Sequence, residues 1–217
     1  YKVAYGRSFG IDPSKVDSDQ RQIGKVQELA LGYQGGPTAF QSMARLYGVD
    51  IAQSYGMLCE AAPDAAKRAR EDYETRGKSS GMSRESWIAA EIVKLGWREA
   101  HPNTQLLWKN LEDAAINALR NPGEKVMCGK LCFLVAGSFL WLRLPSGRPL
   151  CYPYPRLTEK QMPWRDRSGK QATRATFTYR TEINRQWVDS FAYGGLWAEN
   201  VTQAAARDLL ADALKCL

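Results

Sequence analysis

Residues 17–35 read DSDQRQIGKVQELALGYQG, and this stretch decides the fold that we predict for the first half of the chain. The acidic and hydroxyl residues at its start can accept hydrogen bonds from the unpaired N–H groups that open a helix. The glycines at its end, followed by Pro37, are typical of a helix stop. The pattern therefore predicts a helix over residues 18–33.

One side of this predicted helix carries four residues spaced by four, namely Arg21, Lys25, Leu29 and Tyr33. Each step of four advances about 400° around a helix, so the side chains form one stripe, roughly 18 Å long. The two cations begin the stripe, near the helix N-terminus where the dipole favours anions, and an aromatic ring ends it. Because a nucleoside triphosphate has its phosphates and its base in the same order, the stripe is a candidate nucleotide site. The same spacing is also typical of an ordinary amphipathic helix with solvated cations and with Leu29 and Tyr33 in the core.

The composition is that of a globular protein of 217 residues, with 44% apolar and 24% charged residues. This length suffices for one large domain or two small ones. No apolar run reaches the roughly 18 residues that a spanning helix needs, and no cleavable signal pattern opens the chain, so we expect a cytoplasmic protein without membrane contact. Five scattered cysteines favour a reducing compartment. Only one histidine, His101, and no second cysteine pair accompany Cys128 and Cys132, so we predict no zinc site and assign no metal ligand.

The net charge of +7 is concentrated in one segment. Residues 143–185 contain ten lysines and arginines against three acidic residues. Trp164, Phe177 and Tyr179 are interleaved with these cations. Basic residues mixed with aromatic ones are typical of a surface that binds the phosphate backbone of nucleic acids. The alternative is a solvated basic surface without a partner.

The remaining periodicity predicts an α+β fold that is predominantly helical, with a small antiparallel sheet. Residues 1–16 should be irregular, and residues 77–81 should form a loop. Helices are expected over residues 38–47 (burying Phe40, Met43, Ala44 and Tyr47), 60–76, 83–99, 104–119, 182–192 and 196–216. Strands are expected over residues 125–129, 131–136, 139–144, 150–152 and 173–180.

The spacing Arg21-x-x-x-Lys25-x-x-x-Leu29-x-x-x-Tyr33 resembles the fingers-helix motif of family A DNA polymerases, in the version of bacteriophage-type members. The resemblance implies that Arg21 and Lys25 bind the triphosphate of the incoming dNTP and are catalytic, because they stabilise charge on the leaving pyrophosphate. Lys25 would also donate a proton to it. Leu29 would pack against the sugar or base, and Tyr33 would stack near the nascent base pair. Two residues depart from the family's pattern. This chain has Leu29 where the family usually has an aromatic residue, and Gln34 where a glycine often follows the motif tyrosine.

Two later segments resemble the same family. Residues 193–210 are similar to the palm helix that contacts the primer–template minor groove, which makes Gln203 the groove-reading side chain. Residues 145–153 resemble the turn that joins fingers to palm, where Arg148 would touch the DNA backbone. Glu199 stands where other branches carry Asn and takes no implied role.

The resemblance implies a fragment of a DNA polymerase, with the fingers subdomain in residues 1–140 and the fingers-to-palm connection and partial palm in residues 141–217. Its partners would be primer–template DNA and dNTP, and the polymerase would be a monomer in the bacterial host cytoplasm. The carboxylates that hold Mg²⁺ in the family lie outside this chain, so we expect the isolated chain not to extend a primer. The alternatives are the fingers of a single-subunit RNA polymerase and a non-catalytic nucleic-acid-binding domain.

Overall fold

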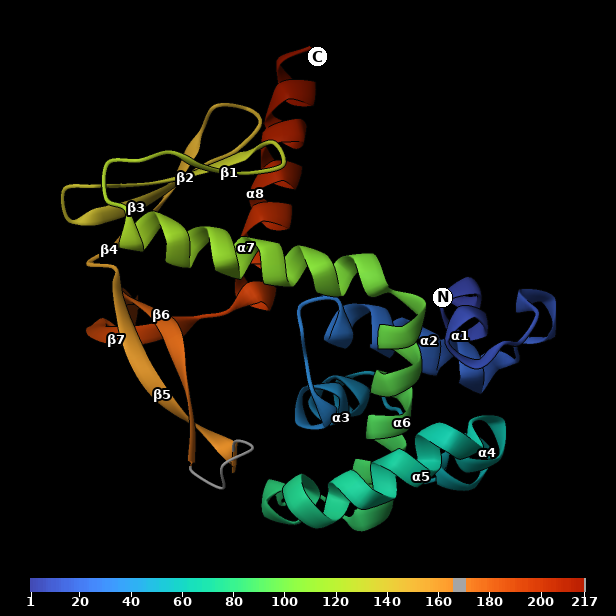
Figure 1. Cartoon of the computed structure of the whole chain (residues 1–217). Helices are drawn as coiled ribbons and strands as arrows, with labels where there is room; N and C mark the ends of the chain where they lie inside the picture. Colours follow the sequence, from blue (N-terminus) through green and yellow to red (C-terminus); the bar gives the residue numbers. More distant parts are fainter. Residues whose placement is uncertain (166–170, 217) are drawn as a thin grey trace. The chain divides into compact units, whose positions relative to one another are not determined.

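The computed structural model describes residues 1–165 and 171–216, without the side chains of residues 160, 162–165 and 171–172. The chain forms two compact units, residues 1–106 and residues 107–217, which are described separately (Figure 1). The boundary predicted between residues 140 and 141 separates a fingers from a palm subdomain. The compact units do not test that boundary.

The first unit is helical. Its helices are α1 (Lys2–Phe9), α2 (Ser18–Leu31), α3 (Pro37–Leu46), α4 (Tyr55–Ala61), α5 (Pro63–Asp72) and α6 (Arg84–Ala100), and α7 (Pro102–Arg120) begins in this unit and continues into the second. Short 3₁₀ and π turns link α1 to α2 and α5 to α6.

Helix α6 forms the core of this unit, where it contacts α1, α2, α3, α4 and α5 (Figure 1). It begins at Ser83, whose hydroxyl oxygen accepts a 3.2 Å hydrogen bond from the backbone N–H of Ser86. Most of its side chains are buried, among them Trp87, Ile88 and Ile92. Its buried side chains include two charged ones, Glu91 and Lys94, which pair with each other at 2.5 Å, as buried charges need to.

Helix α2 begins where the sequence predicts. The backbone N–H of Gln20 donates to Asp17 Oδ1 at 2.8 Å, and the N–H of Asp17 donates to Gln20 Oε1 at 3.1 Å. This reciprocal capping box satisfies two N–H groups of the first turn. The helix buries Ile23 and Val26 against the core and ends at Leu31, two residues before the predicted end.

Three predictions for the elements are wrong. Residues 1–16 are not irregular, because α1 forms there and buries Tyr5 completely. Residues 182–192 are not helical: they form the end of β6 and strand β7. Tyr47 is exposed, because α3 ends at Leu46 and the ring of Tyr47 lies beside Lys25 rather than in the core.

The second unit contains two antiparallel sheets and a long helix. The first sheet has the order β1 (Val126–Cys128), β2 (Leu131–Ala136), β3 (Phe139–Arg143), β4 (Pro149–Pro153). The second has the order β5 (Arg156–Arg165), β6 (Gln171–Ile183), β7 (Gln186–Ala192). Helix α8 (Gly194–Lys215) follows β7. The predicted class, α+β and predominantly helical, is therefore confirmed.

Trp197, at the start of α8, is the centre of the second unit's core and is completely buried. Its ring lies 5.7 Å from that of Phe133 on β2, 4.5 Å from that of Tyr152 on β4 and 5.1 Å from that of Phe177 on β6. All three contacts are edge-to-face, the geometry that aromatic quadrupoles favour. One indole thus joins both sheets to the helix that carries Gln203.

No helix in the described part of the chain is long and apolar enough to cross a membrane.

Candidate nucleotide and nucleic-acid sites

The structure places Arg21, Lys25 and Leu29 on the less buried side of α2. Arg21 is exposed, Lys25 is partly exposed and Leu29 is 37% exposed. Tyr33 lies just past the helix, in the turn that begins at Gly32, and is partly buried. Leu29 is therefore not a core residue, while the exposed cations fit both a nucleotide site and an ordinary solvated helix face.

The two cations of the stripe contact only aromatic rings at close range. Lys25 Nζ lies 4.0 Å from the ring centroid of Tyr47, and Arg21 Cζ lies 5.8 Å from that of Tyr1. In the part of the chain that the structure describes, neither cation forms an ion pair. Cation–π contacts at exposed sites contribute only about 0.5–1 kcal/mol. Both positive charges therefore remain available to an anion such as a triphosphate.

Helices α6 and α1 hold α2 through two hydrogen bonds. The indole N–H of Trp97 donates to Glu28 Oε1 at 2.8 Å, and the amide of Gln27 donates to Ser8 Oγ at 3.2 Å. At about 100° per residue, the buried Gln27 lies nearly opposite Lys25, whereas Glu28 lies about 60° from Lys25, at the edge of the stripe. These contacts fix the rotation of α2.

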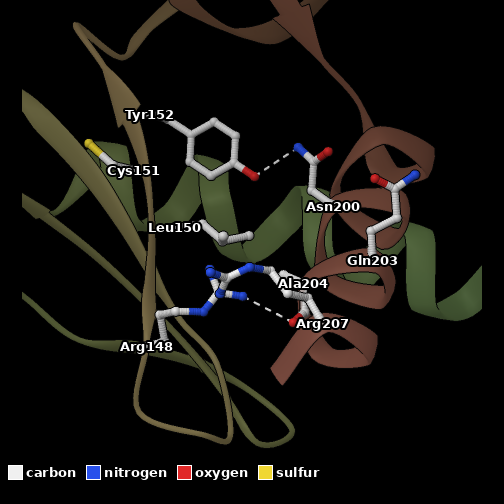
Figure 2. A pocket seen from close by; sticks show the side chains of 8 residues that line it. All are labelled: Arg148, Leu150, Cys151, Tyr152, Asn200, Gln203, Ala204 and Arg207. Atoms are coloured by element: carbon white, nitrogen blue, oxygen red, sulfur yellow. Dashed lines mark hydrogen bonds between the residues drawn. The ribbon is translucent and has the colours of Figure 1, made fainter. Parts of the chain in front are cut away.

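In the second unit, a groove of about 460 Å³ lies between β4 and α8 (Figure 2). We call it the α8 groove; its lining residues are Arg148, Leu150, Cys151, Tyr152, Asn200, Gln203, Ala204 and Arg207. The turn before β4 supplies Arg148, and the exposed side of α8 supplies Gln203. The two DNA-binding residues predicted from separate sequence segments thus line one groove.

Arg148 is fixed to α8 by several contacts. Its Nε–H donates to Asp208 Oδ1 at 2.6 Å. Its Nη2 donates to the carbonyl oxygen of Ala204 at 3.0 Å (Figure 2). The hydroxyl of Ser146 donates to the other carboxylate oxygen at 2.6 Å. The hydrogen bond from Ser146, followed by that from Arg148, holds the pKa of Asp208 below its usual value. The Arg148 side chain is still 34% exposed, so the guanidinium is held in place at the groove without being enclosed.

The remaining polar groups of the groove are neutral or positive. Gln203 is exposed, and its amide donates to Glu199 Oε1 at 3.1 Å. The amide of Asn200 donates to the hydroxyl oxygen of Tyr152 at 2.9 Å (Figure 2). Burial raises the pKa of Tyr152 to about 12, so the phenol is uncharged at neutral pH. Arg207 is exposed, and its Nη1 lies 3.7 Å from Asp208 Oδ1, so it shares that carboxylate with Arg148.

The sequence predicts Arg148 and Gln203 but not the other residues that line this groove. Asn200 and Arg207 follow helical spacing from Gln203, so their shared face could have been predicted with the helix. The contact between Arg148 and Asp208 could not, because it joins segments that only the folded chain brings together.

Of the aromatic residues expected to bind nucleic acid, Phe177 is a core residue instead, whereas Tyr179 is partly exposed. Phe177 is completely buried, and the Tyr179 ring lies 5.1 Å from that of Tyr152. The side chain of Trp164 lies outside the described residues. Among the cations of this segment, Arg156 pairs with Asp189, and Arg174 Nη2 lies 2.7 Å from Glu112 Oε1. Part of the expected basic surface is therefore neutralised within the unit.

Comparison with known proteins relates the chain to a phage enzyme. It is 32% identical over 214 residues to a protein named DNA polymerase from Bacillus phage SP02. The alignment covers 97% of this chain but only 26% of that protein, so the chain spans about a quarter of the length of its relative. No protein-family model and no solved structure matches the chain. Over nearly its whole length, the chain is therefore similar to one part of a phage DNA polymerase.

Proposed function

We propose that the chain is the fingers and adjoining palm part of a bacteriophage-type family A DNA polymerase. In this proposal α2 binds the incoming dNTP and the α8 groove binds the primer–template duplex. Similarity to a phage DNA polymerase over 97% of the chain supports the enzyme class. The uncovered side of α2 and the composition of the α8 groove support the two binding roles.

At α2, Arg21 and Lys25 would bind the triphosphate. Fixed positive charge beside the departing pyrophosphate stabilises the charge that develops on it in the transition state. Lys25, which has no carboxylate partner among the described residues, would also donate a proton to that leaving group. Leu29 would pack against the sugar or base, and Tyr33 would stack near the new base pair.

The metal ions that the family uses are not held by this part of the chain in our proposal. Among the described residues, no three His, Cys, Asp or Glu side chains lie close enough together to hold a metal ion. The Mg²⁺ ligands would come from other parts of the polymerase, and we derive no step through the metal.

The single observation that carries the proposal is that Arg148 and Gln203 line the same groove. A glutamine amide can donate to the acceptors that every base pair presents in the minor groove, so it can bind a duplex without reading its sequence. Arg148 and Arg207 also line this groove, and the two guanidinium groups share the single carboxylate of Asp208, so one positive charge remains for phosphates. These cationic and amide groups suit a paired primer–template.

The α8 groove is tested by the affinity of the chain for a labelled primer–template, measured by fluorescence anisotropy over a range of salt concentrations. Arg148→Ala should weaken binding and reduce the slope of log K against log salt by about 0.9, the value for one lost phosphate contact. Gln203→Ala should weaken duplex binding about fivefold or more, as expected for loss of about 1 kcal/mol. Arg120→Ala, which removes an exposed arginine from α7, is the control and should bind as the unchanged chain does. Unchanged affinity in both groove variants would contradict the proposed DNA-binding role.

A further inference from the structure

The hairpin of β6 and β7 presents an arginine and a tryptophan together, away from the α8 groove residues. Trp187 is 56% exposed, and the guanidinium carbon of Arg180 lies 6.0 Å from the centroid of its ring. Nη2 of Arg180 also donates to the carbonyl oxygen of Trp187 at 3.2 Å. The strand register pairs Arg180 with Asp189 and Glu182 with Trp187, so Arg180 and Trp187 are diagonal neighbours on one face. The structure therefore holds the two side chains together before any ligand binds.

The turn of this hairpin places another cation beside the pair. Asn184 and Arg185 connect the strands, with φ angles of 52° and 63°. Two residues with positive φ form the tight turn that suits a twisted hairpin, and glycine is strongly preferred at its second position. An arginine there is disfavoured by roughly 1 kcal/mol because its Cβ crowds the backbone. The folded chain nevertheless has an exposed arginine at the tip.

The acidic neighbours do not cancel these charges. Asp189 on the same face is paired with Arg156, and the exposed Glu182 is the remaining carboxylate beside Trp187 among the described residues. The tip of the hairpin therefore carries two arginines, Arg180 and Arg185, against one unpaired carboxylate, so its net charge is positive. A surface with a flat exposed ring, a cation over that ring and a second cation nearby is complementary to a base and its phosphate.

We propose that the Arg180–Trp187 pair stacks with an unpaired base of single-stranded DNA, with Arg185 against an adjacent phosphate. The choice of DNA as partner rests on the proposed function, but the pair shares no residue with either site described above. A single strand is the expected form, because the faces of paired bases are covered by their neighbours in a duplex. In a polymerase, this single strand would be template that has not yet been copied.

The test measures binding of the chain to a labelled oligothymidylate by fluorescence anisotropy at low salt. Trp187→Ala should weaken binding about fivefold or more, the effect of losing one stacked base. Trp187→Phe, which keeps a flat ring at the same place, should retain most of the affinity. Arg185→Ala should reduce the slope of log K against log salt by about 0.7, the value for one phosphate contact on a single strand. Arg143→Ala, an exposed arginine on β3 of the other sheet, is the control and should bind normally.

A blunt duplex separates this proposal from the DNA-binding role of the α8 groove. Trp187→Ala should bind the duplex as the unchanged chain does, while Arg148→Ala should not. If the Trp187→Ala chain and the unchanged chain bind oligothymidylate with equal affinity, the proposed stacking by the Arg180–Trp187 pair is wrong. The proposal that the α8 groove binds the duplex would not be affected. The stacking proposal would also be wrong if Trp187→Ala lowered the affinity for the single strand and for the duplex by the same factor. Urea unfolding midpoints of all variants would show that the hairpin changes leave the fold intact.

Discussion

Trp97 donates its indole N–H to Glu28 Oε1 at 2.8 Å and thereby joins the central helix α6 to α2, the candidate nucleotide helix. The ring of His101 stacks on Trp97, with centroids 4.3 Å apart and planes 18° apart. The next residue of α6, Arg98, donates through Nη2 to the carbonyl oxygen of Gly35 at 3.4 Å. The end of α2 and the turn after it are therefore held by α6, while Lys25 remains partly exposed.

Trp97→Phe should destabilise the chain by about 1–2 kcal/mol. The substitution keeps an aromatic ring against His101 but removes the donor, and a hydrogen bond to a charged acceptor contributes about 1.5–3 kcal/mol when well shielded. Glu28 is partly exposed, which places the expected loss at the low end of that range. The free energy of unfolding in urea measures it, with Glu99→Gln, an exposed acid on the same helix, as the control. A Trp97→Phe chain as stable as the Glu99→Gln chain would show that the bond does not hold α2.

Gly35→Ala and Gly36→Ala form a matched pair that tests the turn after α2. A Cβ on Gly35 would lie 2.0 Å from the carbonyl oxygen of Ala30, whereas a Cβ on Gly36 would meet nothing within 4 Å. Since a backbone atom blocks the first site, the turn that carries Tyr33 must move in Gly35→Ala. We expect Gly35→Ala to lower the urea midpoint and, in the full polymerase, to raise the KM for dNTP. Gly36→Ala should change neither, and equal behaviour of the two variants would contradict this account of the turn.

The lowered pKa of Asp208 predicts how the free energy of unfolding depends on pH in the acidic range. Its pKa in the folded chain lies below the ordinary 3.8, first because Ser146 donates to it and then because Arg148 does. A lowered pKa in the folded state stabilises the fold above about pH 3.8, and this contribution is lost as the pH falls through the folded value. The unchanged chain should therefore be more stable than Asp208→Asn at pH 6, and the difference should shrink below pH 4. Urea unfolding at several pH values measures this, with Asp212→Asn as control. A difference that stays constant down to pH 3 would contradict the pairing.

The sequence predicts those features that depend on local chemistry. The capping residues and the period of four predicted α2, and the exposed side of the helix carries Arg21 and Lys25 as expected. Strand β7 was missed because Trp187 and Phe191 also fit a helical spacing, and only pairing with β6 identifies the strand. In a strand every second residue shares a face, and Trp187 and Phe191 both lie on the exposed face of β7.

Contacts between distant segments could not be predicted. Phe177 was expected to bind nucleic acid, but Trp197 from α8 covers it. Arg148 was expected to touch the DNA backbone, and the sequence did not show that Asp208 and the carbonyl group of Ala204 hold its guanidinium. Both results depend on where α8 packs, and helical spacing within a segment carries no information on that placement.

The most direct measurement is the rate of single-nucleotide incorporation by the full-length polymerase carrying Lys25→Ala, under single-turnover conditions. Lys67→Ala, an exposed lysine on α5, is the matched control. If Lys25 stabilises and protonates the leaving pyrophosphate, its loss should slow incorporation by about 10²-fold or more, the usual contribution of a general acid. The affinity for primer–template should stay nearly unchanged. An incorporation rate equal to that of the Lys67→Ala enzyme would contradict the assignment of α2 as the nucleotide-binding helix.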